Sequence, residues 1–70
     1  LSVIAMNLIV LTAAQAEKIT AIDKAAQVAY STKSSRADID AIAAQANVLK
    51  SLVYGCSTVG EVSTIVIDIS

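Results

Sequence analysis

Few side chains in this 70-residue chain can carry acid–base or nucleophilic chemistry. The sequence contains no histidine and a single cysteine, Cys56. The usual general base near neutral pH is therefore absent, and a cysteine nucleophile would lack its usual partner. The same count excludes a zinc finger and a disulfide framework. We therefore expect no enzymatic activity, no metal and no cofactor.

Two short motifs have the spacing of ligand sites but lack the residues that would bind a phosphate or a calcium ion. Segment 55–60 carries glycines at the GxxxxG spacing of a phosphate loop, yet Glu61 and Val62 stand where Lys and Ser or Thr are required. Asp38 and Asp40 are followed by no third carboxylate or glycine at calcium-loop spacing. The first motif therefore predicts a turn. The second predicts negative charge in the first turn of a helix, where it complements the helix dipole.

Composition points to a protein that buries apolar surface by association. The chain is 56% hydrophobic, 3% aromatic and 16% charged, with a net charge of -1, which argues against both disorder and nucleic-acid binding. Thirteen of the apolar residues are alanine, and each alanine buries little. Small domains without disulfides, metals or large aromatic side chains commonly gain stability by oligomerisation. We expect one small assembly domain over residues 1–70.

The middle of the chain predicts an antiparallel helical hairpin. The first helix is expected over residues 12–30, because Thr12 and Gln15 have the spacing of a capping box. The second is expected over residues 36–54, with Gly55 as a left-handed C-cap. In both segments, apolar residues recur at steps of three and four. The residues expected to pack the hairpin are Ile19, Ile22, Ala26, Ile39, Ile42, Ala46, Leu49 and Val53.

The N-terminal segment is uncharged from Leu1 to Ala16. It is too short for a typical transmembrane helix, whereas its apolar run and small-x-small end fit a signal peptide in part. The β-branched residues Val3, Ile4, Ile9 and Val10, with apolar residues on both alternating faces, favour a buried strand. A helical start is the alternative.

The C-terminal segment changes period. Over residues 59–70, Ile65, Ile67 and Ile69 alternate with Val66, Asp68 and Ser70. Alternation of this kind predicts a second strand. Its edge would be open for pairing with another chain.

The predicted fold class is therefore α+β, in the order β-α-α-β, with the sheet completed by oligomerisation. An all-α hairpin with a helical N-terminus is the alternative. Two strands make a poor sheet alone, and one helical hairpin can cover only one of its faces. The residues expected to mediate self-association are Val3, Ile4, Ile9, Ile65, Val66, Ile67 and Ile69.

These features predict a self-assembling structural subunit. The expected setting is a virion, as a phage coat, tail or decoration protein, or an extracellular filament. Its partners would be identical subunits and other structural proteins of the same assembly. One alternative is a pilin-like exported peptide of the cell envelope that uses residues 1–16 as a membrane segment before assembly. Another is a small dimeric regulator or inhibitor that binds a protein target.

Overall fold

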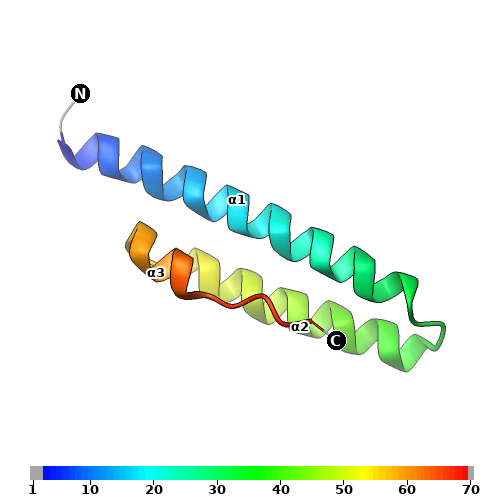
Figure 1. Ribbon diagram of the computed structural model, residues 1–70. Helices are drawn as coiled ribbons and strands as arrows, with labels where there is room; N and C mark the ends of the chain where they lie inside the picture. The colour runs from blue at the N-terminus through cyan, green and yellow to red at the C-terminus, as the bar shows by residue number, and fades with distance from the viewer. Residues whose placement is uncertain (1–2, 70) are drawn as a thin grey trace.

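The computed structural model describes residues 3–69, with side chains from residue 8 onward. Its helices are α1 (Val3–Ser31), α2 (Arg36–Tyr54) and α3 (Val59–Thr64), and an extended tail, residues 65–69, follows α3. Helices α1 and α2 form an antiparallel hairpin, and α3 packs on α1 (Figure 1). The molecule is elongated, with extents of 50 × 16 × 15 Å.

The predicted β-α-α-β order is wrong, and the all-α hairpin named as its alternative fits. Residues 3–11, expected to form the first strand, are the opening turns of α1. Residues 59–64, expected to open the second strand, form α3. No strand occurs within residues 3–69. Residues 1, 2 and 70 lie outside the part of the chain that is described.

Helix α1 extends well before the predicted start at Thr12. The Thr12 hydroxyl does not cap a helix; it donates to the Leu8 carbonyl at 2.8 Å, inside α1. No glycine or proline interrupts residues 3–31, and β-branched residues cost a helix only a few tenths of a kcal/mol each. A first strand would have had one partner at most in this chain, and an isolated two-stranded sheet is marginal in water. A continuous helix satisfies the same backbone groups locally.

Helix α3 begins at a variant of the capping box, in which Glu61 bonds the amide of the residue before the N-cap, and the sequence analysis overlooked it. The Thr58 hydroxyl accepts from the Glu61 amide at 3.1 Å, and the Glu61 carboxylate accepts from the Ser57 amide at 3.2 Å. These two bonds satisfy free amides at the start of the helix and favour a helical turn over a strand. At the other end, Ile65 adopts an extended conformation (φ -73°, ψ 118°) and begins the tail.

The tail is extended but is not part of a sheet. Residues 65–69 run back along the hairpin (Figure 1). The Lys18 ammonium donates to the Ile65 carbonyl at 3.1 Å and holds the start of the tail against α1. The side chains of Ile65, Ile67 and Ile69 pack on the hairpin core. The tail is therefore held mainly by side-chain packing.

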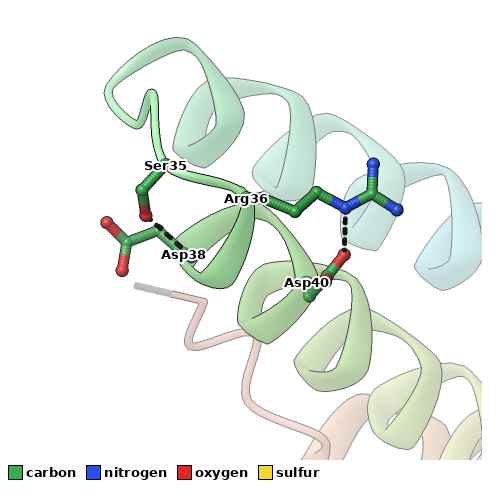
Figure 2. Close-up of polar contacts among 4 residues, drawn as sticks. All are labelled: Ser35, Arg36, Asp38 and Asp40. Carbon is green, nitrogen blue, oxygen red and sulfur yellow. Dashed lines mark hydrogen bonds and ion pairs between the residues drawn. The ribbon is translucent and has the colours of Figure 1, made fainter.

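Helix α2 has the predicted bounds, Arg36–Tyr54. It starts where the Ser35 hydroxyl accepts from the Asp38 amide at 3.1 Å (Figure 2). The predicted left-handed cap at Gly55 is wrong, because this residue is right-handed (φ -80°, ψ -9°). The Gly55 amide still donates to the Ser51 carbonyl at 3.0 Å. The helix thus ends in an ordinary α-turn.

The core lies between α1 and α2, and half of its buried residues are alanine. Its buried members are Ile22, Ala26, Ala29, Ile42, Ala46 and Val53. Partly buried residues that pack against it are Ile19, Tyr30, Leu49, Ile65, Ile67 and Ile69. Ile39, expected in the hairpin interface, is half-buried. Alanines at the contact allow close approach of the two helices, and the tail isoleucines add apolar volume beside it.

Candidate interaction site

The paired acidic residues near the start of α2 serve the helix terminus. Asp40 forms an ion pair with Arg36 at 3.2 Å, one turn earlier, and both side chains are exposed (Figure 2). Asp38 lies in the first turn, where its charge complements the helix dipole. Residues 3–69 contain no group of three or more potential metal ligands.

Segment 55–60 is a turn followed by a helix start. The Glu61 carboxylate bonds to the Ser57 amide, so a negative side chain stands at the amide that an incoming phosphate would need. Cys56 is half-buried, and its thiol donates to the Leu52 carbonyl at 3.2 Å. The segment therefore provides a helix cap and a chain reversal.

One flank of the hairpin is polar and is bridged by an ion pair. Lys50 of α2 contacts Asp23 of α1 at 2.5 Å. The hydrogen bond from the Lys50 ammonium to the Asp23 carboxylate raises the pKa of Lys50 above 10.5. Gln27 and Asn47 line the same flank, which is therefore suited to contact with water.

The projecting end of α1, residues 8–13, is a candidate interaction surface. The Gln15 side-chain amide donates to the Val53 carbonyl at 3.0 Å, which places the end of α2 beside residue 15. The N-terminal end of α1 extends beyond α3 (Figure 1). Leu8, Ile9 and Val10 are 54–59% exposed, and at 100° per residue they span about 200° of the helix circumference. This end of α1 is apolar on several sides at once.

A second candidate surface, the tail face, consists of Val28, Val48, Leu52 and Val66. Because side chains alternate along an extended segment, the inward packing of Ile65 and Ile67 turns Val66 outward, where it is 76% exposed. Val28 of α1 lines a groove with Ile67 and Ile69. Leu52 of α2 lies beside Ile65, and Val48 lies one turn before Leu52 on the same side of α2.

The predicted self-association residues have different positions in the structure. Ile9 and Val66 are exposed, whereas Ile65, Ile67 and Ile69 are half-buried against the hairpin. Val3 and Ile4 are in α1, and their side chains lie outside the described part. The sequence analysis did not single out Val28, Val48 and Leu52, which are also exposed. Val48 and Leu52 had a usable signal, since they form an i, i+4 pair away from the predicted core stripe.

Comparison of the chain with protein-family models, with curated proteins and with solved structures gave no match. No helix in residues 3–69 is long and apolar enough to cross a membrane. The exposed aliphatic side chains of the two surfaces offer a partner apolar contact rather than hydrogen bonds or charge.

Proposed function

We propose that this chain is a structural subunit that assembles with copies of itself, as part of a virion (a phage coat, tail or decoration protein) or of an extracellular filament. The observation that carries the proposal is the projecting end of α1. A helix end that is apolar on several sides is suited to an environment of other helices or lipid. Leu8, Ile9 and Val10 are 54–59% exposed in the subunit, so a copy of the chain would supply the surface that covers them.

The composition supports copies of the chain as that covering surface. Charged residues are depleted at the centres of protein interfaces, and the first sixteen residues of this chain carry no charge. The hairpin core consists of three alanines and three larger aliphatic residues, so the subunit buries little apolar volume by itself. Association would add the apolar contacts that a chain of this size lacks.

Sedimentation velocity of the intact chain at micromolar concentration tests the proposal. We expect the wild type to sediment as a multimer and Ile9→Lys to lower its mass, because the variant places a charge on the projecting end. Thr20→Lys is the matched control, since Thr20 is also exposed on α1 but lies outside this end. A folded, non-associating 7.2 kDa species would contradict the proposal.

A second candidate is an exported peptide that inserts the start of α1 into a membrane before assembly. The uncharged segment from Leu1 to Ala16 favours it. Co-sedimentation with neutral phosphatidylcholine vesicles separates the two candidates. Insertion predicts that the monomeric chain binds vesicles and that Ile9→Lys abolishes this binding. Self-assembly predicts a multimer in the absence of lipid.

A further inference from the structure

The tail is joined to the helices by few polar contacts. The Ile65 carbonyl accepts from the Lys18 ammonium at 3.1 Å, and the Ile65 amide donates to the Val62 carbonyl of α3 at 3.2 Å. Along residues 66–69, no backbone group is hydrogen-bonded to another residue in the described part of the chain. A segment without a backbone ladder opens at a lower cost in free energy than a helix or a paired strand.

The apolar contacts of the tail are only partly sealed from water. Ile67 and Ile69 are half-buried, whereas Ile22 and Ile42 of the helices are completely buried. A groove of about 530 Å³ remains open between the tail and α1, and Ala29 of α1 lines it together with both tail isoleucines. Partial burial and an open edge are features of a region that opens locally before the whole domain unfolds.

Lys18 fixes the position at which the tail begins. Its side chain is half-buried beside Val62 of α3, and no carboxylate of the described residues lies within ion-pair distance of its ammonium. The acceptor of this ammonium is the Ile65 carbonyl. A hydrogen bond from a charged donor is stronger than one between neutral groups. Lys18 therefore holds Ile65 against α1, and the rest of the tail depends on its side-chain contacts.

We propose that the tail is a strap that opens and closes on the hairpin while α1 and α2 remain folded, and that the Lys18 ammonium stabilises the closed form. In the closed form, Ile67 and Ile69 pack on the core that contains Ala29. In the open form, the groove beside Ala29 is uncovered and both isoleucines are available for apolar contact with a partner. The opening is a property of the single subunit and does not depend on the proposed self-assembly.

The rate of thiol labelling measures the opening. The native thiol is first removed by Cys56→Ser, and Ala29→Cys then reports on the groove beside the tail. Ala46→Cys is the matched control, because Ala46 is also buried but lines the opposite, polar flank. When closing is faster than labelling, the rate is proportional to the open fraction. We expect Ala29→Cys to react at least about tenfold faster than Ala46→Cys, because opening the tail costs less free energy than opening the hairpin.

Adding Lys18→Met distinguishes opening of the tail from simple exposure of the thiol. Loss of the charged donor should speed the labelling of Ala29→Cys about tenfold and leave that of Ala46→Cys unchanged. Lys24→Met is the matched charge control, since Lys24 is exposed on the same helix, and it should change neither rate. Equal labelling of Ala29→Cys and Ala46→Cys would overturn the proposal, because the tail would then open only with the whole domain. Fast labelling of Ala29→Cys that Lys18→Met does not alter would overturn it too, as would a parallel rise at both positions.

Discussion

Neighbouring residues of the tail should make separate contributions to folding and to association. Ile67 is half-buried against the hairpin, whereas Val66 is exposed and turned away from it. Replacing a fully buried isoleucine with alanine costs about 2–5 kcal/mol, so Ile67→Ala should reduce the free energy of unfolding by about 1–2 kcal/mol. Val66→Ala removes little buried surface within the subunit, since Val66 is 76% exposed, and should stay within about 0.5 kcal/mol.

Thermal unfolding followed by far-ultraviolet circular dichroism measures both effects. For a chain of this size, 1 kcal/mol corresponds to about 4–8 °C. Ile67→Ala should therefore lower the midpoint by about 4–16 °C at every protein concentration. Val66→Ala should leave the intrinsic stability of the subunit nearly unchanged and reduce the rise of the midpoint with concentration, because that rise reports association.

Equal loss of intrinsic stability in the two variants would refute this reasoning. It would mean that both faces of the tail are buried within one subunit, as in a strand covered on both sides. A midpoint that rises equally steeply with concentration in the wild type and in Val66→Ala would refute the expected role of Val66 in self-association.

Two further predictions concern the contact between α1 and α2. Ala46→Leu should destabilise the hairpin by about 1–3 kcal/mol through overpacking, because Ala46 is buried. The matched variant Ala44→Leu is on the exposed side of α2 and should have little effect. Equal shifts in the thermal midpoint of the two variants would show that the helices pack in another register. The raised pKa of Lys50 means that the stabilisation from the Asp23–Lys50 pair is fully present below pH 10.5 and is lost as the pH rises through the folded-state pKa. Wild-type stability should therefore converge with that of Asp23→Asn in alkaline melts, and a constant difference between the two proteins above pH 10.5 would contradict this prediction.

Helix α2 could be predicted from the sequence because independent local signals agree there. Ile42, Ala46 and Val53 recur at helical spacing, and all three are buried in the structure. Ser35 lies three residues before Asp38 and caps the helix through the Asp38 amide. Signals of this kind act within one or two helical turns, so the helix that they predict does not depend on the tertiary structure of the rest of the molecule.

The secondary structure at the two ends of the chain was predicted wrongly, because the apolar pattern of a segment does not determine which other element it packs against. Leu8, Ile9 and Val10 are consecutive apolar residues, a pattern shared by a buried strand and by a helix that is apolar on several sides. The alternation of Ile65 and Ile67 correctly indicates an extended backbone, since period two fixes which side chains point the same way. It does not specify whether that backbone bonds to a strand or lies on two helices.

The N-terminal cap of α3 determines how the tail is used within the subunit. Thr58 and Glu61 turn residues 59–64 into a helix, and the chain then returns along the hairpin. The tail isoleucines are consequently used within the subunit, where they cover a core that contains three alanines. No backbone ladder is present in the tail for a neighbouring strand to continue. We expect association through this flank to use the side chain of Val66 and its aliphatic neighbours, so a charge at residue 66 should weaken it.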